Sequence, residues 1–552
     1  MAKKTRRRAA ATGGRQPVFE AMSVLLQPSP GRDGIAVARA VARRVRLTGW
    51  TIDPIVEDGT EVELVPPRRI TTPRAWELTY VLRDQPEVAH AEPMFRYLVP
   101  ENAPLTPSKA SGRGSTHDPA TDNEFDWSLR KANVLEAWRL FGSATPPGAG
   151  VVVGHPDTGY TLHPELAEPA RILIGAGYDF DDDDPNPIDD LDAGVLDNPS
   201  HGTGTGSVIL SGVGSPGGGP GAFVSGAAPH AMLIPIRTTE SVLLLSMRGL
   251  RKAIDHASAQ GAQVVSISLG GPLPGFGLRR AILRALDGGT IVLAAAGNEV
   301  GVVVFPAAFD EVVAVAASNI RDTPWRGSSH GIAVDVSAPG ESVWRARTIR
   351  DHNGRLTFSV ERGNGTSFAV ATTAGVAALW LSYHGWPKLV RKYGVANIPR
   401  VLRQLLQDTC RTPRGWNTGE YGAGIVDARK LLEAKLPDAV PARKLRSATR
   451  APVATDATGI ETLMHLFPGA SRTRVEELVA GLLHVEDRDL PMILQAYGDE
   501  LAFQLIMQPA LLESLRQSAR GGRLAAAGRQ AAKRRLVSAG LSPRLRRQLN
   551  RR

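Results

Sequence analysis

A serine stands at the entry to a long apolar helix pattern. The stretch GNGTSFAVATTAGVAALWL, residues 363–381, begins with a glycine-rich turn and places Ser367 where the apolar pattern starts. A serine there exposes its hydroxyl at a helix start, and its backbone N–H is a free donor at the positive end of the helix dipole. A buried Ala-rich helix with a Ser/Thr cap is the structural alternative. A base, an orienting acid and a second oxyanion donor elsewhere in the chain would favour catalysis instead.

Three polar residues in other motifs can supply those groups. Asp157 follows an apolar strand in HPDTG, His201 lies in SHGTGTGS at a turn into a helix, and Asn298 ends the apolar run AAAGN. A neutral imidazole suits a base near pH 7, and it needs an acceptor on its other nitrogen. An Asn amide and the N–H of Ser367 can donate to a tetrahedral oxyanion. A turn cap, a surface histidine and a turn asparagine are the bland alternatives for each residue alone, but the set predicts acyl transfer.

The elements around these residues predict a parallel sheet. Between about residues 126 and 436, apolar strands alternate with helical segments; the strands are GAGVVVGHPDTG, AMLIPIR, AQVVSISLGG, GTIVLAAAGN and EVVAVAAS. Fully apolar strands of this kind indicate an α/β fold whose sheet is covered by helices on both faces. Sites in such sheets form beyond the carboxyl ends of the strands, where Asp157 and Asn298 stand.

The patterns on either side of this body predict further domains. The N-terminal part reads strand-helix-strand-strand-helix-strand, the order of a ferredoxin-like α+β domain. The part after residue 458 is helical by its apolar spacing. We expect a basic disordered arm (1–16), the ferredoxin-like domain (17–99), a Pro/Ser/Gly/Thr-rich linker (100–125), the α/β body (126–436), a Pro/Ala/Thr linker (437–458), an all-α module (459–515) and a basic tail (516–552).

Charge and composition restrict the partners. The 552 residues carry a formal net charge of +10, but residues 1–15 hold +6 and residues 511–552 hold +11, so the remainder is acidic at −7. The basic segments have no interleaved aromatics and no nucleic-acid motif. We therefore interpret them as solvated arms, with nucleic acid or an anionic surface as the alternative and not as an expected partner. The single cysteine, Cys410, allows no intrachain disulfide and no Cys-based zinc site.

The N-terminus predicts where the protein is found. Its basic run is followed by no apolar segment of a secretory signal, and no stretch approaches the roughly 18 apolar residues of a membrane helix. We expect a cytoplasmic protein without a membrane span.

The motifs in this order resemble those of the subtilisin family of serine proteases, the subtilases. The resemblance covers roughly residues 126–436, and the matching segments are VVVGHPDTGYTLHPEL, HGTGTGSVI, SISLGGP, AAAGNE, VDVSAPG and GNGTSFA. The order Asp, His, Ser along the chain is that of the subtilisins themselves. Residues 17–98 resemble the family's inhibitor-type propeptide, best in LRDQPEVAHAEPMF. The resemblance implies a subtilisin-like parallel sheet with helices on both faces, preceded by a ferredoxin-like propeptide.

The resemblance also implies catalytic roles by position. Ser367 would be the nucleophile, and His201 the general base and acid. Asp157 would orient the histidine, and Asn298 would donate to the oxyanion.

Substrate contacts follow from the same resemblance. Ser268, Leu269 and Gly270 would pair as an extended strand with the substrate backbone and form one wall of the primary pocket. Ala295 and Gly297 would form the other wall. Backbone pairing of this kind confers affinity without much sequence selection.

This sequence departs from the family pattern at three places. The family commonly has His-Val after HGT, where this chain has Gly204-Thr205, and Pro-His-Val after the Ser motif, where it has residues 371–373, Ala-Thr-Thr. Neither change removes a catalytic atom. Val304 stands two residues before a proline, where the family often has a glycine on the pocket floor. That substitution predicts a shallow pocket for a small side chain.

An acidic run precedes His201. Residues 179–192, DFDDDDPNPIDDLD, carry eight carboxylates. Oxygen-rich loops can bind calcium, as in many subtilases, but this spacing fits no EF-hand. We interpret the run as a solvated acidic loop, keep calcium as an alternative without assigned ligands, and expect no required cofactor.

These observations together predict a serine endopeptidase that hydrolyses polypeptides through an acyl-enzyme and is made as a self-processing zymogen. Its own N-terminal domain would be an intramolecular inhibitor, and the helical module would bind a protein partner or regulate the enzyme. A dedicated processing protease or peptide cyclase acting on one recruited client is the first alternative. A catalytically silent scaffold and a nucleic-acid-tethered protein are alternatives from other classes.

Overall fold

The structure is a computed structural model. It describes residues 18–55, 59–98, 125–142, 145–166, 171–191, 198–212, 226–242, 244, 247–271, 274–299, 302–440, 459–467, 470–483, 485, 488–519 and 540–550. The predicted arm at 1–16 and nearly all of the two predicted linkers lie outside these residues.

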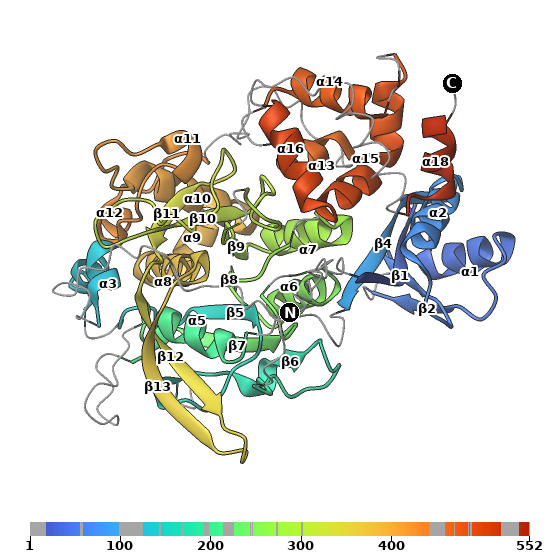
Figure 1. The fold of residues 1–552 in the computed structure, drawn as a ribbon. Helices are drawn as coiled ribbons and strands as arrows, with labels where there is room; N and C mark the ends of the chain where they lie inside the picture. The colour runs from blue at the N-terminus through green and yellow to red at the C-terminus, as the bar shows by residue number, and fades with distance from the viewer. Residues whose placement is uncertain are drawn as a thin grey trace, which may run out of the picture.

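A seven-stranded sheet forms the centre of the body (Figure 1), with strand order β11-β10-β9-β8-β5-β7-β6 and only parallel pairings. Every residue of the four strands β8 to β11 is buried, as expected for a sheet covered on both faces. This confirms the predicted α/β fold. The strands are β5 (Val152–Asp157), β6 (Tyr178–Asp179), β7 (Met232–Arg237), β8 (Val264–Ile267), β9 (Ile291–Ala295), β10 (Val313–Ser318) and β11 (Val336–Pro339).

Helices cover the sheet on two faces, each with its own apolar cluster. One cluster joins the sheet to α5 (His201–Leu210), α8 (Thr366–His384) and α10 (Ile398–Thr409). The other joins it to α6 (Arg248–Ala259) and α7 (Phe276–Asp287). The smaller elements of the body are α3 (Trp127–Lys131), α4 (Val134–Trp138), β12 (Val343–Arg350), β13 (Leu356–Gly363), α9 (Trp386–Tyr393), α11 (Thr418–Tyr421), α12 (Ala428–Glu433) and three short 3-10 turns, Pro164–Leu166, Ile174–Ala176 and Val395–Asn397.

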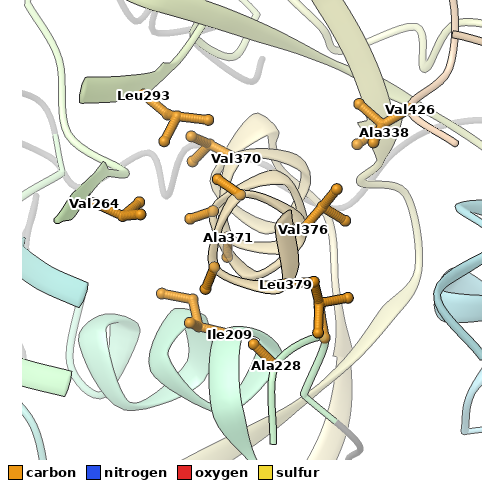
Figure 2. Packing of buried hydrophobic residues seen from close by; sticks show 14 of the residues in the cluster. Ile209, Ala228, Val264, Leu293, Ala338, Val370, Ala371, Val376, Leu379 and Val426 are labelled. Carbon is orange, nitrogen blue, oxygen red and sulfur yellow. The ribbon is translucent and has the colours of Figure 1, made fainter. Parts of the chain in front are cut away.

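Helix α8 is buried along its first sixteen residues, Thr366 to Leu381. Figure 2 shows its side chains surrounded by residues of α5, of the strands and of the loops beside them. A β-carbon added at Gly375 would stand 2.5 Å from the Ala227 β-carbon and 3.2 Å from the carbonyl oxygen of Ile209 in α5. The absence of a side chain there lets the two helices approach, and their first turns carry Ser367 and His201.

The N-terminal domain has the predicted strand-helix order and an antiparallel sheet, β2-β3-β1-β4. Both helices pack on one face of this sheet through an apolar core of their own. Its elements are β1 (Val18–Pro28), α1 (Gly34–Arg44), β2 (Thr51–Pro54), β3 (Val62–Val65), α2 (Thr72–Arg83) and β4 (Val88–Leu98).

The C-terminal helices form a separate cluster, which we call the helical module; it consists of the described residues within 459–519 and 540–550. For residues 540–550, the structure corrects the predicted end at 515 and the solvated tail after it; residues 520–539 lie outside the described part. Leu541 and Leu545, four residues apart on one helix face, are buried in the module's apolar core, so the last helix belongs to it. The helices are α13 (Gly459–Leu466), α14 (Arg472–Leu483), α15 (Leu490–Ile506), α16 (Pro509–Ala519) and α18 (Pro543–Asn550). No helix in the described part of the chain is long and apolar enough to span a membrane.

Candidate active site

Asp157 and His201 meet at the carboxyl edge of the sheet. Asp157 is the last residue of β5, His201 is the first residue of α5, and His201 Nδ1 lies 2.7 Å from Asp157 Oδ1. The N–H of Thr158 donates to the same carboxylate oxygen at 2.8 Å. Burial by itself would raise the pKa of Asp157, but the charge and hydrogen bond of His201 outweigh it and lower that pKa. The carboxylate therefore stays ionised and fixes the proton of the imidazole on Nδ1.

The second oxygen of Asp157 contacts Thr205, which in turn contacts His155; sequence reasoning missed both residues. Thr205 Oγ1 lies 3.2 Å from Asp157 Oδ2 and 3.0 Å from His155 Nε2. Burial lowers the pKa of His155, so its ring is neutral near pH 7 and can donate to the threonine hydroxyl, which in turn donates to the carboxylate. The departure at Gly204-Thr205 thus adds a donor to the buried acid.

Ser367 occupies the second position of α8, as the glycine-rich turn predicts. Its hydroxyl donates to the carbonyl of Ser268 over 3.4 Å, and not to His201. The ring centroid of the next residue, Phe368, lies 6.5 Å from that of His201. The first turns of α8 and α5 are therefore close to each other. Catalytic hydrogen bonds often tighten only when substrate binds, so a long contact of the serine is compatible with nucleophilic attack.

Asn298 and the N–H of Ser367 converge on one small space. Asn298 Oδ1 accepts from both the N–H and the hydroxyl of Thr366, each at 2.9 Å, and this fixes the orientation of the amide. The point where Gly365 would carry a β-carbon lies 3.4 Å from Asn298 Nδ2 and 3.6 Å from the nitrogen of Ser367. Two donors facing one open space at a helix start can stabilise an oxyanion.

The two predicted walls of the primary pocket enclose Val304. A β-carbon at Gly270 would stand 2.5 Å from Val304 Cγ2, and one at Gly297 would stand 3.0 Å from Val304 Cγ1. The valine side chain therefore fills the space between the segments 268–270 and 295–297.

For Gly270 the structure differs from the expected substrate pairing. Its N–H donates to the carbonyl of Val242 at 3.1 Å, and its carbonyl accepts from the N–H of Leu244 at 2.7 Å. Backbone groups are rarely left unpaired when buried, and these two find partners in the segment before α6. A substrate strand can pair with Gly270 only after it displaces Val242 and Leu244.

Comparison with known proteins identifies this arrangement. The family model described as the subtilase family matches residues 148–424, half of the chain, which includes every residue of the site. The chain belongs to the subtilase family. It is a subtilisin-type serine endopeptidase, with the three side-chain types of that family's catalytic triad at one edge of its sheet.

Curated relatives match the body of this subtilase. It is 29% identical to thermitase of Thermoactinomyces vulgaris over 307 residues. This alignment covers 55% of this chain and 94% of thermitase. It is 29% identical to a thermophilic serine proteinase of Bacillus sp. strain AK1 over 305 residues. This alignment covers 54% of this chain and 65% of that proteinase. The fold resembles the crystal structure of fervidolysin from Fervidobacterium pennivorans, described as a keratinolytic enzyme related to subtilisin. That match has a TM-score of 0.55 and 20% identity, and it covers 78% of this chain and 63% of fervidolysin.

The acidic run of this subtilase is organised by a buried arginine. Arg237 ends β7, and its guanidinium lies 2.6 Å from both Asp179 and Asp182 and 3.0 Å from Asp190. The interpretation of a merely solvated loop is therefore wrong for Asp179, which is buried beside this cation, whereas Asp182 and Asp190 contact the same cation and keep 60% and 50% of their side chains exposed. Among the described residues, which exclude Asp192, no group of three or more His, Cys, Asp or Glu is placed to hold a metal ion.

The residues that sequence reasoning missed had weak signals. His155 lies two positions before Asp157, and Thr205 lies four after His201, so strand and helix periods place both beside the acid. Arg237 is the last residue of β7, which lies between β5 and β6 in the sheet. Only this strand order shows that the arginine lies beside the acidic run, which begins in β6.

Replacing Thr205 by valine should destabilise the subtilase. The buried Asp157 carboxylate would lose a hydroxyl donor, so we expect the free energy of unfolding to fall by about 1–3 kcal/mol. Denaturant unfolding measures this, in a Ser367→Ala background that prevents self-digestion. Thr205→Ser keeps the hydroxyl and is the control. Equal stability of the two variants would show that the hydroxyl does not support the acid.

Proposed function

We propose that Ser367, His201 and Asp157 act as nucleophile, base and orienting acid, with Asn298 and the N–H of Ser367 as the oxyanion donors. The observation that carries this assignment is the 2.7 Å contact between His201 and Asp157 at a helix start that packs beside the helix start of Ser367. The family makes the chain a serine endopeptidase, and the geometry supports this set of residues for the task.

The mechanism follows from these positions. His201 Nε2 accepts the proton of Ser367 as Oγ attacks the substrate carbonyl, and the oxyanion forms toward Asn298 and the N–H of Ser367. The imidazolium, stabilised by Asp157, then protonates the leaving amine as the C–N bond breaks and the acyl-enzyme forms. Water attacks the ester with His201 as base, and the carboxylic acid leaves as Ser367 regains its proton.

We further propose that the N-terminal domain is an intramolecular inhibitor and that the enzyme itself cuts the linker that joins this domain to the body. Its sheet contacts α6 and α7: Glu61 lies 3.3 Å from Arg251 and 2.9 Å from Arg280, and Glu63 lies 2.7 Å from Arg248. Glu61 and Arg251 are almost completely buried, so separating the domains would leave both charges without their partners. The end of β4 is followed directly by the linker.

Autoprocessing predicts a mass difference between the wild type and Ser367→Ala. We expect the wild type to be cut between residues 95 and 126 and the variant to stay whole, because only the wild type has the nucleophile. Intact mass spectrometry after expression measures this. Two whole proteins would contradict self-processing, and two proteins cut alike would assign the cut to another protease.

Removing the oxyanion amide should reduce turnover sharply. We expect Asn298→Ala to lower kcat by about 10²–10³, the loss measured for the corresponding donor of subtilisin. Gly365→Ala should also lower kcat, because its methyl group would stand between the two donors. Steady-state peptide hydrolysis measures both effects. A loss below about tenfold in Asn298→Ala would exclude Asn298 as an oxyanion donor.

The valine between the pocket walls should set the preference for the residue before the cut. We expect the wild type to favour small side chains there, and Val304→Gly to raise kcat/KM for phenylalanine by about tenfold or more. Peptides that differ only at that residue measure the change, and the alanine peptide is the internal control. A wild-type preference for large aromatic residues would contradict the shallow pocket.

A further inference from the structure

The N-terminal domain lies between two parts of the chain. The face of its sheet contacts α6 and α7 of the body, as described above. Its helix α2 contacts the helical module, and Figure 1 shows the red helix α18 alongside the blue α2. Segments from the two ends of the chain therefore pack against each other.

Aromatic rings form the apolar part of this second interface. Phe503 of α15 stacks on Phe95 with ring centroids 4.6 Å apart and contacts Trp76 at 6.2 Å. Tyr497 of α15 meets Tyr80 of α2 edge to face at 4.9 Å. Phe503 is 3% exposed, and it clusters with these residues of the N-terminal domain and not with the module's own core. Its burial therefore depends on the N-terminal domain.

One buried carboxylate joins three segments at the same interface. Glu500 of α15 is fully buried, and it accepts from the hydroxyl of Tyr80 at 2.8 Å. The same carboxylate accepts from the N–H of Ser542 at 2.6 Å and from its hydroxyl at 2.8 Å, just before α18 begins. Removing the N-terminal domain would take one of these donors away from a buried charge, which is costly.

Opposite charges extend the contact at its edge. Arg544 of α18 lies 3.3 Å from Glu77, in the middle of α2, and 2.5 Å from Asp84, directly after its last residue. A second ion pair has its charges reversed: Arg83 of α2 supplies the cation and lies 3.6 Å from Asp499 of α15. The basic end of the chain thus has an acidic partner within the N-terminal domain.

We propose that the helical module is a clamp that holds the N-terminal domain on the peptidase body after the linker between them is cut. This rests on the proposed role of that domain as an inhibitor. Cutting a linker removes only the effective concentration that the tether supplies and leaves both interfaces in place. Because the body and the module are one chain, the freed domain is held at two sites at once. Activation then takes two steps: scission of the linker, and release of the module from α2.

The test uses the full chain in the Ser367→Ala background, with a recognition sequence for a site-specific protease inserted after Gly112. After complete cutting, size-exclusion chromatography with mass detection shows whether the N-terminal fragment travels with the rest of the chain. Phe503→Lys and Arg544→Glu weaken the clamp without touching the module's core. Met492→Lys is the matched control on α15, since Met492 is 63% exposed, and Arg472→Glu is the control for charge reversal on α14.

We expect the cut chain and both controls to retain the fragment. Phe503→Lys should raise its dissociation constant roughly 10–100-fold, the factor expected when one aromatic side chain is no longer buried. Arg544→Glu should act in the same direction. Retention by all variants would assign the binding to α6 and α7 alone, and loss from the unsubstituted cut chain would show that no clamp exists. Either result overturns the proposal.

An activity arm separates this proposal from the proposed function. With Ser367 present, the cut Phe503→Lys chain should hydrolyse a small peptide sooner than the cut Met492→Lys chain. If neither hydrolyses peptide after its fragment has gone, the catalytic assignment fails and the retention result stands. If the fragment leaves Phe503→Lys and both chains are equally active, the clamp does not control access to the site, and the proposal is overturned.

Discussion

The close approach of α8 to α5 is the constraint on which the rest of the site depends. Gly375 faces the carbonyl of Ile209 and the methyl of Ala227 at distances that leave no room for a β-carbon. This contact lets α8 and α5 pack closely, and the first turn of each helix carries one reacting group. A larger residue at position 375 would push α8 away from α5 and so separate Ser367 from His201 without altering either residue. The reason is that a packed core transmits such a displacement and does not absorb it.

The electrostatics of the sheet edge follow from burial. Asp157 and Arg237 end neighbouring strands and are partners in register, and both are almost completely buried. A buried charge persists only when its hydrogen bonds and countercharges are supplied locally. For Asp157 these come from His201, Thr158 and Thr205, and for Arg237 they come from the acidic run.

The same argument applies to the contacts of the N-terminal domain. Its sheet places Glu61 and Glu63 against the arginines of α6 and α7, and its helix α2 places Tyr80 and Trp76 against the helical module. Each contact buries polar or aromatic groups that would meet water if the domain left. A segment held on two faces by one continuous chain dissociates only when both faces open, so its retention exceeds what either face would achieve alone.

The local sequence determined the fold class of the body, the place of Ser367 and the family. Strand and helix periods indicate the α/β body, the glycine-rich turn places Ser367 at a helix start, and the motifs around Asp157, His201 and Asn298 identify the family, because each depends on residues close together in the chain. Only the tertiary structure decided the contacts between distant segments: the acidic run around Arg237, the pairing of Gly270 with Val242 and Leu244, and the final helix against α2. The physical reason is that periodicity specifies which face of an element is apolar, whereas the partner of that face depends on the packing of the whole chain.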